Sequence, residues 1–98
     1  MKSVGLKKAF TLLGYKNIEI SRGYNYRSGF MEKDGQLFYF MTGDLRDRQD
    51  DNFFVLVRTA KDRKDYIGGP NTYPVIHALN RLGYKLSVPR TKCDYNAN

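Results

Sequence analysis

The densest run of side chains that could do chemistry lies between residues 58 and 72. It begins with basic residues and ends with two glycines and two helix-capping residues: Arg58, Lys61, Arg63, Lys64, Gly68, Gly69, Asn71 and Thr72. Glycine lets the backbone approach a ligand closely, and a helix N-terminus offers unpaired N–H groups with partial positive charge. The pattern therefore predicts contact with a phosphate. A solvated loop leading into an ordinary capped helix fits the same residues, because neither the Walker A nor the dinucleotide-binding spacing is present.

A second run, between residues 22 and 30, combines arginine with tyrosine. Two arginines enclose two tyrosines in the order Arg22, Tyr24, Tyr26 and Arg27, and Tyr66 adds a further aromatic ring later in the chain. Tyrosine stacks on unpaired bases and arginine binds phosphate, so the run indicates a nucleic-acid contact. The same residue types anchor protein interfaces. Alternatively, Tyr24 and Tyr26 continue a core face that begins at Ile18 and Ile20 and extends to Phe30.

The remaining candidates give little reason to expect an enzyme. The acidic loop holds Asp44, Asp47, Asp50 and Asp51, but arginines lie among them and the EF-hand spacing is absent, so we expect a solvated turn. His77 and Cys93 have no third group that would complete a nucleophilic site, and no paired Cys or His ligands are present. We therefore expect a non-enzymatic protein without a metal or cofactor.

The hydrophobic pattern predicts one α+β domain over residues 1–98, in the order α-β-β-β-α-β. We expect a mainly antiparallel sheet with two helices packed on one face, and a frayed tail over 89–98. Apolar residues at 6, 9, 10 and 13 predict the first helix, with Ser3 as its N-cap and Gly14 at its end. The second helix begins near Pro74 and ends at Gly83, with a buried face made of Val75, Ile76, Leu79 and Leu82.

Three segments between the helices read as strands. Residues 18–31 alternate and predict a strand interrupted near Gly23 or Gly29. Asp34-Gly35 predicts a hairpin turn that leads into residues 37–42, which are apolar on both faces and therefore central in the sheet. Residues 53–59 form the third strand, and residues 85–88 a short final strand after the second helix.

The order α-β-β-β-α, with a basic loop before the second helix, resembles the double-stranded-RNA-binding domain in topology. That family carries a lysine cluster at the start of its second helix. Here Lys61, Arg63 and Lys64 come several residues earlier, the helix begins Tyr73-Pro74-Val75 without a basic residue, and a final strand is added. The resemblance is one of fold, and fold alone does not imply function.

Charge is the feature that bears most on a partner. The chain carries 17 Lys and Arg against 10 Asp and Glu, a net +7, and residues 58–92 hold eight bases and two acids. No apolar run is long enough to span a membrane, and a single cysteine cannot form an internal disulfide, so we expect a cytoplasmic protein.

These observations lead to two main hypotheses, beside a third in which Gly68 to Thr72 bind a nucleotide or a small phosphate compound. The first is a small nucleic-acid-binding module whose surface follows the third strand, the basic loop and the second helix. Its phosphate contacts would come from the eight residues between 58 and 72 named above, extended by Arg22, Arg27 and Arg81, and Tyr24, Tyr26 and Tyr66 would stack on bases or line an interface. The alternative is an inhibitor or adaptor, of the kind that phages and mobile elements encode, which binds a host protein or ribonucleoprotein such as a defence nuclease complex.

Overall fold

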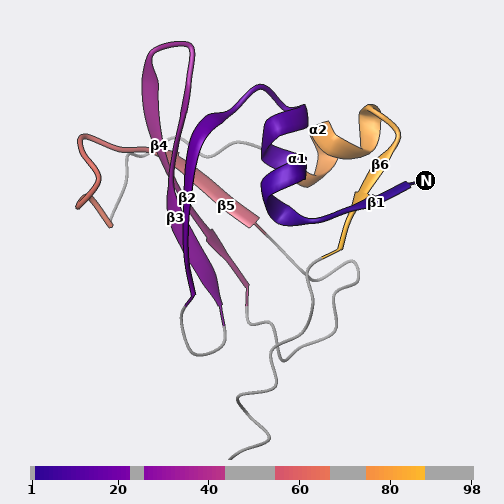
Figure 1. Cartoon of the computed structure of the whole chain (residues 1–98), viewed down its shortest axis with the longest axis horizontal. Helices are drawn as coiled ribbons and strands as arrows, with labels where there is room; N and C mark the ends of the chain where they lie inside the picture. Colours follow the sequence, from indigo (N-terminus) through magenta and orange to yellow (C-terminus); the bar gives the residue numbers. More distant parts are fainter. Residues whose placement is uncertain (1, 23–25, 44–54, 67–74, 88–98) are drawn as a thin grey trace, which may run out of the picture.

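The computed structural model describes residues 2–22, 26–43, 55–66 and 75–87 (Figure 1). The elements are β1 Lys2–Val4, α1 Leu6–Leu12, β2 Lys16–Arg22, β3 Arg27–Lys33, β4 Gln36–Thr42, β5 Val55–Thr59, α2 Val75–Arg81 and β6 Tyr84–Leu86. This is the predicted α+β architecture with two helices.

A four-stranded antiparallel sheet forms the larger part of the fold, in the order β2-β3-β4-β5. A two-residue turn joins β3 to β4, and its residues Asp34 and Gly35 have φ angles of 53° and 78°. Positive φ at both central positions belongs to the hairpin turn that Asp-Gly favours, so the predicted turn is confirmed. The apolar strand β4 is central, as its two-faced hydrophobicity predicted.

Both helices cover one face of this sheet, called here the inner face (Figure 1). Phe10 of α1 packs on Phe40 of β4 with ring centroids 4.8 Å apart, and Tyr15 meets Phe38 edge-on at 5.4 Å. Val75 of α2 belongs to the same buried cluster. The helices therefore shield the inner face from solvent. They do not cover the opposite face of the sheet, called here the outer face.

A second, smaller sheet pairs the first strand of the chain with the last. β1 and β6 run parallel, with Lys2 opposite Tyr84 and Val4 opposite Leu86. The sequence did not predict β1, because three residues are too few to show a period. Ser3 lies in this strand and is not the N-cap of α1; Gly5 holds that position and makes no side-chain capping bond.

Two further expectations are corrected. The alternating run 18–31 was predicted as one strand interrupted near Gly23 or Gly29, and it is divided between β2, which ends at Arg22, and β3, which begins at Arg27. The interruption is therefore confirmed at the first place and not at Gly29, which lies inside β3. Phe30 is the register partner of Glu19, so it lies on that residue's face and does not share a face with Ile18 and Ile20, which pack on the inner core. Leu82 follows α2 and is 52% exposed, so it is not part of the buried helix face.

The resemblance to the double-stranded-RNA-binding topology is also weaker than the sequence indicated. In the described part of the chain, four strands lie between the two helices where that pattern has three, and β1 precedes the first helix. The predicted elements or sites at 23–25, 44–54, 67–74 and 88–98 lie outside the described residues. They include Tyr24, the four aspartates of the acidic loop, Asn71 and Thr72 as caps of the second helix, and Cys93.

Candidate functional site

The outer face of the sheet carries its own aromatic cluster. Phe30 of β3, Tyr39 of β4 and Ala60 are buried together there, with Leu37 and Met41 packed against them. An antiparallel sheet commonly leaves one face to water. Here the chain continues past β5 and folds back over that face, and residues 60–66 are called the crossing segment below.

Tyr66 ends the crossing segment with its ring on the aromatic cluster. The Tyr66 ring lies 5.5 Å from the Phe30 ring and 6.0 Å from the Tyr39 ring, in edge contacts with both. Tyr66 is nevertheless 64% exposed, because only part of the side chain rests on the sheet. The ring is therefore held in place by two others and still offers most of its surface to a partner.

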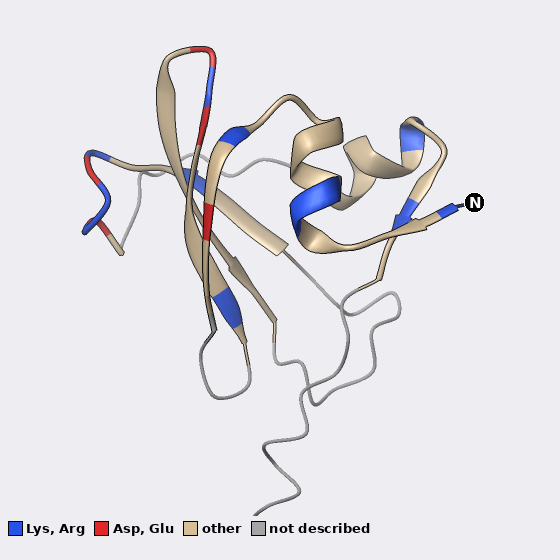
Figure 2. Cartoon of the chain, viewed as in Figure 1, with Lys and Arg blue, Asp and Glu red and all other residues tan. Residues whose placement is uncertain are grey.

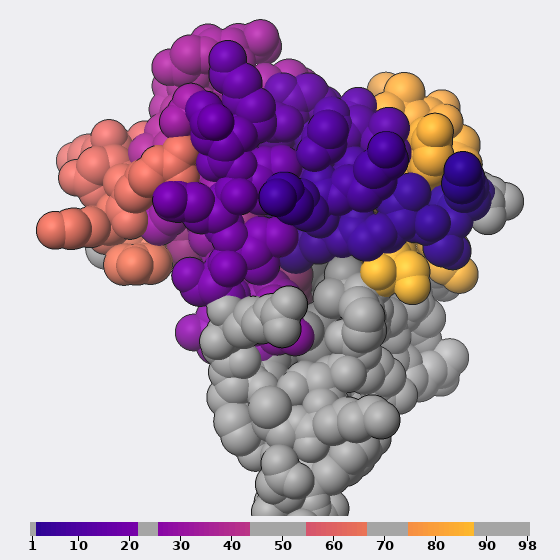
Figure 3. Space-filling model, viewed as in Figure 1, coloured from indigo at the N-terminus to yellow at the C-terminus, as the bar shows by residue number. Residues whose placement is uncertain are grey.

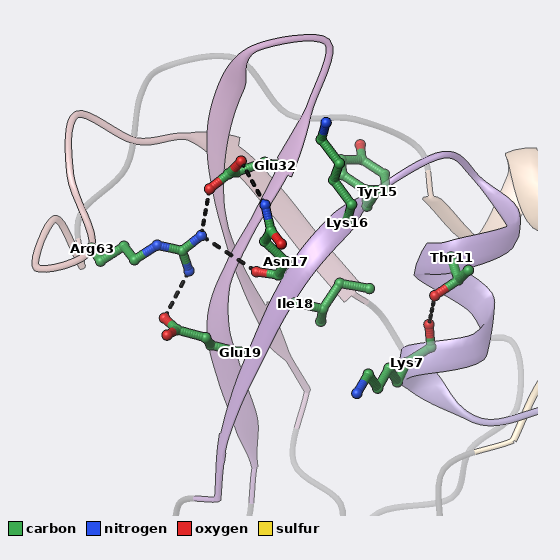
Figure 4. Close-up of a pocket in the computed structure, with 9 residues that line it drawn as sticks. All are labelled: Lys7, Thr11, Tyr15, Lys16, Asn17, Ile18, Glu19, Glu32 and Arg63. Atoms are coloured by element: carbon green, nitrogen blue, oxygen red, sulfur yellow. Dashed lines mark hydrogen bonds and ion pairs between the residues drawn. The ribbon is translucent and has the colours of Figure 1, made fainter.

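Arg63 attaches the crossing segment to the first two strands of the sheet (Figure 4). One guanidinium nitrogen donates to Glu19 Oε1 at 2.7 Å and the other to Glu32 Oε2 at 2.8 Å. The second nitrogen also donates to the carbonyl of Asn17 at 3.3 Å. A guanidinium with two carboxylate partners is an anchor within the fold, and this is a different role from the predicted phosphate contact.

Glu32 is the acceptor at the centre of this network. It accepts a hydrogen bond from Asn17 Nδ2 at 3.0 Å in addition to the bond from Arg63. The Asn17 bond and then the Arg63 bond lower the pKa of Glu32 below its ordinary value. The carboxylate is therefore ionised at neutral pH and holds Arg63 in position.

The two aspartates of the crossing segment brace its turn. Asp65 Oδ2 accepts the backbone N–H of Lys61 at 2.9 Å, and Asp62 Oδ1 accepts that of Lys64 at 2.8 Å. Such side-chain bonds to nearby backbone groups fix a tight turn. The side chains of Lys61 and Lys64 are left exposed on the outside of this turn.

Tyr39 and Arg58 lie beside each other beneath this segment. They are register partners in β4 and β5, so both side chains project from the outer face, where Arg58 is half-buried. Burial raises the pKa of the Tyr39 hydroxyl, and a hydrogen bond with Ser28 acts in the opposite direction. Tyr39 is therefore neutral at physiological pH.

The structure brings some of the predicted site residues together and separates others. Arg58, Lys61, Arg63, Lys64 and Tyr66 meet at one side of the outer face. Tyr26 is 39% exposed next to Arg27, which begins β3 and donates to the Tyr26 carbonyl at 3.1 Å. Arg22 is the register partner of Arg27. Arg81 ends α2, in the layer that covers the inner face (Figure 2). Gly68, Gly69, Asn71 and Thr72 lie outside the described residues.

Sequence reasoning missed a groove along the start of β2. It has a volume of about 580 Å³ and extends from Lys7 and Thr11 of α1, across Ile18, to Arg63 (Figure 4). Its carboxylates, Glu19 and Glu32, lie 44 and 31 residues from Arg63 in the chain. No local signal connects residues so far apart, so only the fold reveals this set.

Other classes of site were sought in the same residues. Within 2–22, 26–43, 55–66 and 75–87, no three His, Cys, Asp or Glu side chains are grouped closely enough to hold a metal ion. No helix in these ranges has the length and apolar character needed to cross a membrane. Comparisons with known protein families, with curated proteins and with solved structures found no match.

Proposed function

We propose that this protein is a non-enzymatic module that binds single-stranded nucleic acid on the outer face of its sheet. The observation that carries the proposal is Tyr66, whose largely exposed ring is held against Phe30 and Tyr39. Aromatic rings that are fixed before binding stack on bases with little loss of side-chain freedom. A base is available for stacking only when it is unpaired, which favours a single strand.

The cations around Tyr66 supply the second requirement, a surface for the phosphates. Lys61 and Lys64 are exposed in the same turn, and Arg58 lies in the strand beneath it. Lysines beside a stacking ring can follow the backbone of a strand whose bases meet the ring. In this proposal Arg63 does not bind phosphate; it holds the turn in the position that Tyr66 requires.

The test is the binding of fluorescein-labelled single-stranded DNA and RNA, followed by anisotropy at rising salt. We expect the affinity to fall linearly with salt on logarithmic axes. Tyr66→Ala should weaken binding by roughly fivefold to a hundredfold, the loss of one stacked base. The double variant Lys61→Gln/Lys64→Gln should reduce the salt slope by about 1.4, since each phosphate contact on a single strand contributes about 0.7.

Two controls separate local contacts from general effects. Lys16→Gln/Lys33→Gln removes the same charge from residues outside the crossing segment, and Leu82→Ala removes an exposed apolar side chain from another part of the surface. Both should bind single strands much as the unmodified protein does. Failure to bind any single strand at about 50 mM salt would refute the proposal, because electrostatic attraction is strong there.

A second candidate is the inhibitor or adaptor that binds a host protein or ribonucleoprotein. The exposed rings of Tyr26 and Tyr66, with arginine and lysine beside them, are residue types that anchor protein interfaces. In this case a host partner should remain bound after nuclease treatment, and Tyr66→Ala should release it. A partner lost on nuclease treatment supports the nucleic-acid proposal instead.

A further inference from the structure

The other side of the molecule has an unusual distribution of charge. The helical layer, defined here as residues 2–15 and 75–87, contains β1, α1, α2 and β6. It holds five cations, all exposed, and no aspartate or glutamate: Lys2, Lys7, Lys8, Arg81 and Lys85. Acidic residues are coloured only on the sheet side in Figure 2. Among the described residues, the acids are Glu19, Glu32, Asp34, Asp62 and Asp65.

The sheet side, in contrast to the helical layer, carries both positive and negative side chains. The described residues outside the helical layer carry eight cations against those five acids. Arg63 forms ion pairs with Glu19 and Glu32, and all three residues lie on the sheet side. A surface built for solubility alone mixes both signs of charge. A layer with one sign creates a field that attracts a polyanion.

All five cations are exposed to solvent on the elements of this layer. Lys7 and Lys8 are on the exposed side of α1, because Leu6, Ala9 and Phe10 occupy its buried side. Lys2 and Lys85 come from the paired strands β1 and β6. In the space-filling view the first and last elements of this layer form one continuous surface (Figure 3). The layer packs on the inner face, so it lies on the side of the sheet opposite Tyr66.

The chemistry of the layer differs from that of the outer face. Lysine and arginine side chains are exposed here, whereas the tyrosine and phenylalanine rings described in this layer are buried or half-buried: Phe10, Tyr15 and Tyr84. The imidazole of His77 is the one ring that is exposed among the described residues of the layer. A surface with five exposed cations and a single imidazole contacts mainly backbone phosphates and offers little area on which bases can stack. Such contacts suit paired nucleic acid, whose bases are already stacked within the helix.

We propose that the helical layer is a second nucleic-acid-binding surface, which takes the phosphate backbone of a duplex without regard to sequence. The inference rests on the proposed function in one respect: the outer face takes a single strand at the same time. One molecule then joins a duplex to a single strand, as at a junction between paired and unpaired nucleic acid.

The test measures duplex and single-strand binding separately on the same variants. Lys8→Gln/Lys85→Gln should lose affinity for a labelled 20-base-pair duplex, with a salt slope reduced by about 1.8, and should keep its affinity for a single strand. Tyr66→Ala should lose affinity for the single strand and should keep its affinity for the duplex. Lys61→Gln/Lys64→Gln removes the same charge from the crossing segment on the outer face, and it should have a smaller effect on duplex binding. Circular dichroism checks that each variant is folded.

Capture on beads tests the bridge directly. An immobilised duplex should retain a labelled single strand only when the protein is added, and either Lys8→Gln/Lys85→Gln or Tyr66→Ala should lower the amount retained. The inference is overturned if the unmodified protein does not bind the duplex, or if both double lysine variants lose duplex affinity equally. Either result leaves the single-strand measurement to decide the proposed function by itself.

Discussion

Gly29 shows how one residue can fix the spacing of two strands. It lies inside β3 opposite Ile20 of β2. A Cβ at this position would lie 1.8 Å from the carbonyl oxygen of Glu19 and 3.0 Å from the ring of Phe40. The first of these neighbours is backbone, so a side chain fits only if β2 moves. Glycine is needed here for space, as is common where another backbone approaches closely.

We expect Gly29→Ala to be one of the most damaging single-methyl additions in the described chain. The added carbon must push β2 from β3 or displace Phe40, and overpacking of this kind costs about 2–4 kcal/mol in the free energy of unfolding. Urea denaturation followed by tyrosine fluorescence measures the loss. Gly5→Ala is the matched control, since no atom lies within 4 Å of its added carbon. Its cost should stay below about 1 kcal/mol, the usual size of an N-cap effect. Equal losses in the two variants would contradict this account of Gly29.

At the level of single residues, the sequence predicts backbone conformation better than side-chain partners. Gly14 and Gly83 were expected at helix ends and have φ angles of 96° and 90°. This signal is local, because it depends only on the few residues around the helix C-terminus. Arg63 was expected to contact phosphate, and the structure instead pairs it with two carboxylates more than 30 residues away. Nothing near Arg63 in the chain carries that information.

Among the elements, the crossing segment depends on a feature of β2 that only the fold reveals. Strand pairing shifts register between Lys16 and Glu19, and Asn17 has a φ angle of 51°. Such a bulge redirects the side chains of the strand. The Asn17 amide then reaches Glu32, and the Asn17 carbonyl receives Arg63. The position of the crossing segment is therefore set by β2, β3 and Arg63 together.

This attachment should depend on pH through Glu32. Its pKa is lowered in the folded protein, so its contribution to stability is complete above the ordinary value of 4.5 and is lost as pH falls through the folded pKa. The unmodified protein should therefore be more stable than Glu32→Gln at pH 7, and the difference should shrink below about pH 4.5. Urea unfolding at steps from neutral to acidic pH measures it. The hydrogen-exchange protection of the crossing segment, corrected for the intrinsic exchange rate at each pH, should fall over the same range.

The control for this prediction is a carboxylate without such bonds. Asp34 is exposed in the hairpin turn, and Asp34→Asn keeps a residue type that tolerates positive φ. Its stability relative to the unmodified protein should change less with pH than that of Glu32→Gln. A constant difference between Glu32→Gln and the unmodified protein at all pH values would mean that the carboxylate does not hold Arg63.

The elements themselves were largely predictable, and the misses have physical causes. Strong periodicity, the Asp-Gly turn and the helix-ending glycines indicated both helices and the central hairpin. The sequence predicted an interruption within residues 18–31, but it did not predict two separate strands, because the alternation of apolar and polar residues continues from β2 into β3. β1 was missed because a three-residue strand is defined by its partner, β6, which lies about 80 residues later.

Over the whole molecule, charge is arranged by tertiary structure rather than by position in the chain. The sequence places most of the positive excess in residues 58–92. In the fold, Arg81 and Lys85 from that half join Lys2, Lys7 and Lys8 from the start of the chain in the helical layer (Figure 2). The crossing segment belongs to the same half of the chain, and there Asp62 and Asp65 lie between the cations. The number of charges along the sequence cannot show this arrangement, because it does not reveal which segments lie together in the fold.

The helical layer and the large sheet are joined by shared core residues. Leu13 and Leu86 pack against the main cluster of the inner face and also against the small cluster of Val4, Ala9 and Leu79. Each cluster therefore loses packing if the other opens. For a chain of this size, such coupling is expected to give one cooperative unfolding transition.

Leu79→Ala tests that coupling from the side far from the sheet. Leu79 is fully buried, and its truncation should lower the free energy of unfolding by about 2–5 kcal/mol through lost burial and the cavity left behind. If the clusters form one unit, helix loss by far-UV circular dichroism and loss of hydrogen-exchange protection at the amides of β3 and β4, which reports on the sheet, should shift to the same lower urea midpoint. Thr11→Ala, an exposed change in α1, is the control and should move neither signal by much. A variant whose circular dichroism transition moves while the exchange protection of β3 and β4 stays in place would show that the helical layer unfolds by itself, and the two proposed binding surfaces would then belong to parts of the molecule that can separate.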